Sequence, residues 1–438
     1  MKKSFMTKLL HDRLVRYNQI LILQTLMVIF LFVLSSSTSY SLTLDEAISL
    51  ARETLPSYKA SMLRVTSSEA LYNASISPYL PSLDAAASEG RIFTSSEEFR
   101  TRSYDLTLTY TLFDWGNRRA NRNIARLNLD ISEADLRKNF LDLEFSVKSA
   151  FYTVQALKDA LKQRKIQLKD AEKDFEVADG RYKFGVGKLS DVLQASVRLE
   201  QARFNLIQTG GNLKKGLSDL NSLIGRPLDS DDDLQGMSDI EFIIPDIKKL
   251  SATALDRPEI KQAEDSIKIS ENSKSLIRST FLPTFSVDAS YIKTEGDIIG
   301  SFFEEEKTAA LRATWNIFEL GKFYNYRSAE VEKNVSVENL NDIKRKIVLD
   351  VRKTFEDFMT SWNKLKVAKT QLQQAEHNYS QAFGEYKVGK ADILSLVQAE
   401  SLLADSREQV VLSQLSLMLS KALIERVAGI GKLELLNP

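Results

Sequence analysis

The same pattern occurs twice in the chain, as YDLTLTYTLFDWG at residues 104–116 and as AALRATWNIFELG at residues 309–321, and it is the strongest indication of the fold. In each stretch apolar and polar side chains alternate, and a glycine closes the run. A period of two is typical of a β-strand with one apolar and one polar face. The two stretches therefore predict an amphipathic sheet to which two parts of the chain contribute.

The surrounding sequence is duplicated as well, at an offset that drifts from 202 to 205 residues. Leu-Pro at 55–56 corresponds to Arg-Pro at 257–258, and YKFG at 182–185 corresponds to YKVG at 386–389. A solenoid needs about three or more repeats, so two copies favour a pseudo-symmetric fold.

Each copy shows the same order of elements: one helix, two strands and two long helices. The predicted first helices are 44–77 and 258–280, the strands are about 80–93, 103–113, 282–293 and 307–317, and the long helices fill about 117–223 and 325–427.

The long helices carry a sustained heptad pattern. Between Leu136 and Tyr182 apolar residues recur at alternating spacings of three and four, and only Arg164 breaks this seam. Such a pattern demands left-handed supercoiling against a partner helix. A helix of about 65 residues would reach roughly 100 Å, which predicts an elongated molecule. Return helices are expected from Leu189 and Ala391, after glycine-containing turns.

The N-terminus has the order of a secretory signal. Basic residues precede an apolar run at 20–34, and small residues follow it. The run is shorter than the roughly 20 residues that span a bilayer, so a signal peptide over 1–41, cleaved near 39–41, is favoured over an uncleaved anchor. The domain prediction continues with a first repeat at 42–229, a linker at 230–249, a second repeat at 250–431 and a C-terminal tail at 432–438.

Composition excludes several classes of function. Lys plus Arg equal Asp plus Glu at 59 each, so the chain has no basic surplus of the kind that nucleic-acid binders display. The chain has no cysteine, which excludes disulfides, thiolate metal sites and a lipid on cysteine. Neither a metal site nor a cofactor is predicted. His377 lies in a heptad-rich helix and is expected to be a surface residue rather than a catalytic one, so no enzyme activity is predicted.

Four amphipathic strands cannot stand alone in a membrane, because an open sheet leaves unsatisfied edges in hydrocarbon. Closing such a sheet into a barrel without free edges would require strands from several chains. Tyr104, Tyr110 and Trp315 suit the aromatic girdles of an outer-membrane barrel. A soluble amphipathic sheet is the alternative for any single strand.

The chain resembles the TolC-like outer-membrane efflux family, also called outer membrane factors, over nearly all of its mature length. The resemblance is carried by LDEAI at 44–48, the Leu-Pro steps into strands, LFDWG at 112–116, and YKFG at 182–185 followed by SDVLQA at 190–195.

The resemblance implies a mainly α fold with β structure, in which three copies form an α-helical barrel continuous with a twelve-stranded transmembrane β-barrel, four strands per chain. It also implies a place in the outer membrane with a long periplasmic extension. The implied function is the exit duct of a tripartite efflux or type I secretion system. The implied partners are outer-membrane lipid, a periplasmic adaptor (membrane fusion protein) and an inner-membrane pump of RND or ABC type.

By the same resemblance, five residues of the two helical turns would meet the adaptor. They are Phe184, Gly185, Val186, Val388 and Gly389.

The family's periplasmic gate joins a tyrosine and an arginine of the second hairpin to an aspartate of the first. Tyr386 and Asp191 match the tyrosine and the aspartate, whereas Ala391 occupies the arginine's place and Lys390 lies beside it. We therefore expect Asp191, Tyr386 and Lys390 to form the gate. The two acidic positions of the family's constriction hold Ser395 and Gln398 here, and Asp392 is a substitute acid or a solvated carboxylate.

The main alternative is a periplasmic coiled-coil structural or adaptor protein without a pore. It accounts for the heptads and the signal sequence, but not for the alternating aromatic strands in both copies. The cargo stays open between drugs, metals, small metabolites and polypeptides.

Overall fold

The computed structural model describes residues 41–93, 98–231, 233–235, 244, 246–296 and 305–431. The predicted signal peptide, apart from Ser41, and the predicted tail at 432–438 lie outside the described residues. A small separate unit contains a parallel bridge between Leu42 and Leu234, in which the Leu42 N–H donates to the Asp233 carbonyl at 2.8 Å.

The larger unit contains two copies of one order of elements. The first copy runs α2 Leu44–Thr54, α3 Pro56–Ala74, a short 3-10 turn Ser77–Tyr79, β1 Ser82–Phe93, β2 Glu98–Phe113, α4 Asn117–Lys183 and α5 Leu189–Ile224. The second runs α6 Ile247–Ala254, α7 Pro258–Ser279, β3 Thr284–Gly296, β4 Glu305–Thr314, α8 Leu320–Lys387 and α9 Ile393–Ala428.

Two of the predicted helical regions need correction. The single helix expected over 44–77 is broken, because Pro56 lacks an N–H and forces the preceding Leu55 into extended geometry. Its counterpart α6 was not foreseen, and it begins at Ile247, inside the predicted linker. Asp246 caps α6 by accepting a hydrogen bond from the Lys248 N–H at 2.9 Å.

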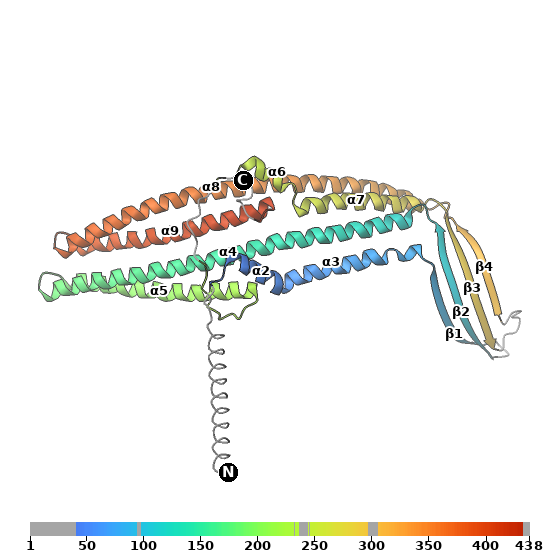
Figure 1. Cartoon of the computed structure of the whole chain (residues 1–438), viewed down its shortest axis with the longest axis horizontal. Coiled ribbons are helices and arrows are strands. Elements are labelled where there is room, and N and C mark those ends of the chain that lie inside the picture. The colour runs from blue at the N-terminus through green and yellow to red at the C-terminus, as the bar shows by residue number, and fades with distance from the viewer. Residues whose placement is uncertain are drawn as a thin grey trace, which may run out of the picture. The chain divides into compact units, whose positions relative to one another are not determined.

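The long helices form two hairpins, α4 with α5 and α8 with α9, which lie side by side in Figure 1. α4 has 67 residues and α8 has 68, which corresponds to about 100 Å each. The two copies share details of packing. A hydroxyl pair joins Ser68 to Ser132 at 2.7 Å in the first, and an equivalent pair joins Ser270 to Ser336 at 2.9 Å in the second. None of the described helices combines the length and the apolar character needed to cross a membrane.

Buried apolar side chains form separate clusters at two positions along the long helices. At one level α6, α7, α8 and α9 bury a cluster that includes Leu250, Ile260, Phe358 and Leu417. Near the hairpin turns all four long helices meet around Tyr386, with Ala178 of α4 and Leu396 of α9 among the contacts.

The sheet is an antiparallel meander in the order β1-β2-β3-β4, so the two copies join where β2 pairs with β3. Figure 1 shows it at the end of α4 and α8 opposite the hairpin turns. Thr107, Ser290 and Thr308 stand side by side on one face, whereas Leu108, Ala289 and Ala309 stand on the other. The alternation of the sequence thus becomes one polar and one apolar face.

Candidate functional site

The two hairpin turns have the same backbone geometry. Gly185 and Gly389 adopt φ of +73° and +77°, the left-handed region that glycine enters without a steric penalty. Phe184, Val186 and Val388 are 86%, 67% and 68% exposed. The five residues expected to meet the adaptor thus lie together at the two turns.

Tyr386 lies beneath these turns and is only 1% exposed. Its hydroxyl oxygen is buried and has no hydrogen-bond partner in the described part of the chain. Burial, and next to it the negative charge of Asp191, raises the pKa of Tyr386. Asp191 of α5 is half-buried, and its Oδ1 accepts a hydrogen bond from Ser190 at 3.3 Å. The structure therefore brings Asp191 near Tyr386 without a direct hydrogen bond between them.

The other two predicted gate residues have different surroundings. Lys390 is exposed, and among the described residues its side chain forms no hydrogen bond or ion pair with Asp191 or Tyr386. Asp392 caps α9, since its Oδ1 accepts hydrogen bonds from the Ser395 N–H at 2.9 Å and the Ser395 hydroxyl at 2.7 Å. These two bonds lower the pKa of Asp392.

A buried polar seam joins α4 to α8 and α9. The Tyr379 hydroxyl donates to Asp174 Oδ1 at 2.9 Å; Asp174 is buried and Tyr379 is half-buried. Burial raises the pKa of Asp174 to about 7, with further contributions from the charges of Glu400 and Asp170. Glu400 is also buried, which raises its own pKa. Arg407 closes the seam with an ion pair to Asp170 at 3.0 Å.

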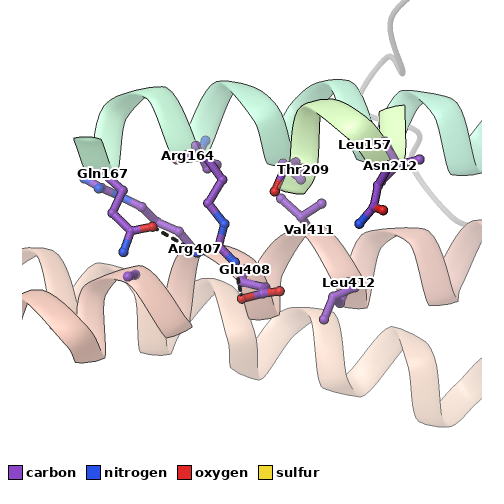
Figure 2. Close-up of a pocket in the computed structure, with 12 residues that line it drawn as sticks. Leu157, Arg164, Gln167, Thr209, Asn212, Arg407, Glu408, Val411 and Leu412 are labelled. Atoms are coloured by element: carbon purple, nitrogen blue, oxygen red, sulfur yellow. Dashed lines mark hydrogen bonds and ion pairs between the residues drawn. The ribbon is translucent and has the colours of Figure 1, made fainter. Parts of the chain in front are cut away.

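Farther from the turns the two hairpins enclose a cavity of about 230 Å³. Figure 2 shows Arg164 of α4 reaching Glu408 of α9, with an Nη2 to Oε2 distance of 2.7 Å, while Thr209 of α5 and Val411 of α9 line the opening. Arg164 is the residue that breaks the heptad seam in the sequence. Its partner on another helix explains why a cation occupies a position that otherwise carries an apolar side chain.

The predicted girdle residues lie on or beside the apolar face of the sheet. Tyr104 and Tyr110 share that face of β2, six residues or about 20 Å apart. Trp315 was expected inside the fourth strand, but β4 ends at Thr314. Its indole N–H donates to the Phe281 carbonyl at 3.0 Å, so it links the strand end to the turn that follows α7.

Comparison with known proteins decides the family. The sequence profile described as Outer membrane efflux protein matches residues 47–226 and 250–429, one segment in each copy of the duplication. This chain belongs to the outer membrane efflux protein family. A relative, the toluene efflux pump outer membrane protein TtgC of Pseudomonas putida, is 23% identical over 85% of this chain and 80% of its own length. The pyoverdine export outer membrane protein OpmQ of the same species is 22% identical over 88% and 86%.

The fold agrees with solved channels. The Campylobacter jejuni CmeC outer membrane channel superposes with a TM-score of 0.78 at 18% identity, covering 89% of this chain and 86% of that one. The fold class predicted from the sequence is confirmed. This efflux protein is an outer-membrane channel protein of the efflux and export type, and the alternative of a periplasmic coiled-coil protein without a pore is set aside.

Sequence reasoning missed the residues that join the two hairpins of this efflux protein, chiefly Asp174 and Tyr379, and also Arg181, whose Nη1 donates to the Tyr386 carbonyl. Each lies among many charged or aromatic residues of a long helix, and its partner is about 200 residues away, as Asp174 and Tyr379 show. The break at Arg164 was the one signal that pointed to such contacts.

Proposed function

We propose that three copies of this chain close into one exit duct, with β1 of each copy pairing with β4 of the next. Support comes from the sheet, whose outer strands have no partner on their far edges within the described chain. An open edge in hydrocarbon leaves backbone groups unsatisfied, whereas closure satisfies them. Three sheets of four strands give an even-numbered barrel of twelve strands.

The faces of the sheet support the same arrangement. Leu83, Leu106 and Leu311 lie on the apolar face and are exposed in the single chain. Asp105, Thr107 and other polar residues occupy the opposite face. With the apolar face toward lipid, Tyr104 and Tyr110 stand near the two edges of the membrane as an aromatic girdle, and Trp315 follows at the helix end of the sheet.

Cysteine pairing across the proposed strand junction tests closure, because the natural chain has no cysteine. Cysteine at Ala85 in β1 is combined in turn with cysteine at Ala309, Leu311 or Ala313 in β4. We expect at least one pair to give covalent trimers after oxidation in membranes, whereas each single cysteine gives none. Covalent dimers without trimers from every pair would contradict a closed ring of three.

We propose further that Phe184, Gly185, Val186, Val388 and Gly389 meet a periplasmic adaptor, which links the duct to an inner-membrane pump of RND or ABC type. The support is the exposed apolar character of the two turns. In this arrangement cargo passes through the duct without chemical change, so the chain performs no catalytic step and needs no cofactor.

The periplasmic gate is proposed at the same end. Asp191, Tyr386 and Lys390 would hold the hairpins of the closed duct, with Lys390 reaching a neighbouring copy, and Asp392 would supply an acidic ring through its second oxygen. The unpartnered hydroxyl of Tyr386 beside the charge of Asp191 supports this assignment. The single-channel conductance of Asp191→Ala should exceed that of the natural protein, and an unchanged conductance would remove Asp191 from the gate.

We propose the domain division predicted from the sequence, with repeats at 42–229 and 250–431, except that the second repeat starts with α6 at Ile247. The corrected start of α6 shortens the connecting segment at its C-terminal side.

A further inference from the structure

Arg181, in the last turn of α4, touches both hairpin turns at once. Its Nη1 donates to the Tyr386 carbonyl at 2.6 Å, and its Nη2 donates to the Val186 carbonyl at 3.4 Å. The guanidinium carbon lies 4.9 Å from the centre of the Tyr386 ring. One side chain of the first hairpin is thus attached to the end of α8 in the second.

The hydrogen bond from Arg181 to the Tyr386 carbonyl is partly buried, whereas the one to the Val186 carbonyl is exposed. The Nε atom of Arg181 is buried and has no hydrogen-bond partner in the described chain, and the same holds for the Tyr386 hydroxyl. Hydrogen bonds from a charged donor contribute more than neutral ones, and a cation over an aromatic ring adds further attraction once both are desolvated. A planar fork that reaches two carbonyls is specific to arginine, because lysine offers a single point charge.

In the second turn, the backbone at Gly389 lies close to the Arg181 side chain. A Cβ on Gly389 would lie 3.2 Å from Arg181 Nη1, whereas a Cβ on Gly185 would meet nothing within 4 Å. The two glycines have nearly the same positive φ. Gly389 is therefore constrained by Arg181 as well as by its backbone conformation.

We propose that Arg181 is the positioning residue that latches the two hairpins of one chain together and so favours the closed duct. This inference deepens the proposed function, since it names the residue that regulates opening at the same turns. Here the cation comes from the first hairpin, whereas the Lys390 side chain of the second hairpin is exposed in the single chain.

Spin-label distances test the latch without requiring conduction. Cysteines replace the exposed Lys188 and Lys387, one beside each turn, and labelled chains are diluted with unlabelled ones so that distances within one chain dominate. We expect Arg181→Gln to broaden and lengthen the distance distribution, and Arg181→Lys to restore it in part. Lys183→Gln is the matched control, because it also removes a cation from the last turn of α4. Among the described residues, the Lys183 side chain pairs only with Asp179.

An unchanged distribution in Arg181→Gln would overturn the latch, and so would an equal change in Lys183→Gln. The trimer mass is measured in each sample, so a failure of assembly is recognised separately. If Arg181→Gln changes the spin-label distances but the natural protein forms no channel, the proposed contact of Arg181 between the hairpins is supported and the proposed channel function is contradicted.

Planar-bilayer recordings then connect the latch to opening. We expect Arg181→Gln to raise the ratio of open to closed time about tenfold, which corresponds to about 1.4 kcal/mol. Gly389→Ala should raise it more than Gly185→Ala, because both replacements strain the backbone but only the first displaces the guanidinium. Equal effects of the two alanines, or an unchanged ratio in Arg181→Gln, would contradict the inference.

Discussion

Replacing Asp174 by asparagine should remove a pH dependence from the seam between α4 and α8. The folded-state pKa of Asp174 is about 7 against an ordinary value of 3.8, with burial as the main cause. Between these two values the folded chain keeps a proton that the unfolded chain releases, so stability falls as pH rises through the window. The difference corresponds to about 4 kcal/mol, lost in full above pH 7.

Other charged groups face the same carboxyl. Glu400 and Asp170 disfavour its ionisation, whereas Lys173 and the hydrogen bond from Tyr379 favour it. Glu400 has a raised pKa too, so it contributes a slope of the same sign. Asparagine retains an oxygen that accepts from Tyr379 but cannot ionise, so Asp174→Asn isolates the contribution of this one group.

Hydrogen exchange measures the effect locally. Peptides covering Asp174 in α4 and Tyr379 in α8 are followed from pH 5 to pH 8, with correction for intrinsic exchange. We expect protection in the natural protein to fall with rising pH, and Asp174→Asn to be similar at pH 5 and better protected at pH 8. The control is Asp179→Asn, which removes an exposed ion pair of little energetic weight. The same slope in Asp174→Asn as in the natural protein would show that ionisation of Asp174 does not cause the pH dependence.

Three further predictions concern other parts of the chain. Lys148→Met removes a buried cation that pairs with both Glu144 and Glu425 and should cost about 3–5 kcal/mol in thermal unfolding, and a cost below about 1 kcal/mol would be incompatible with the burial of these ion pairs. Leu106→Arg, on the apolar face, should cost about 2–4 kcal/mol near the membrane centre and lower the folded yield, whereas Thr107→Arg on the polar face should not. Equal yields would speak against the proposed orientation of the sheet. Phe184→Asp should reduce export in cells while Phe184→Tyr retains most of it, and full export by both would exclude Phe184 from the adaptor contact.

Periodicity explains why the large elements could be predicted from the sequence. The heptads between Leu136 and Tyr182 indicate one uninterrupted helix, and α4 extends without a break from Asn117 to Lys183. The alternation at 104–112 likewise fixes which side chains of β2 share a face. These patterns are local, so no knowledge of the partner element is needed to recognise them.

Other features depend on single residues or on distant partners. Pro56 divides the first helix, although the pattern on both sides of it is helical. α6 has only eight residues, too few for a clear period. The contact of Arg181 with Tyr386 joins residues 205 positions apart, and nothing in either local sequence indicates it. The position of Lys390 beside Ala391 can be read from the sequence, whereas the placement of the Arg181 cation against Tyr386 depends on the packing of the two hairpins.

Three copies of this chain are proposed to form one conducting duct. The most direct test is planar-bilayer conductance of the detergent-extracted protein, with the oligomer mass measured on the same sample. We predict discrete channels from a species with the mass of three chains. A non-conducting monomer or dimer that is soluble without detergent would contradict the account.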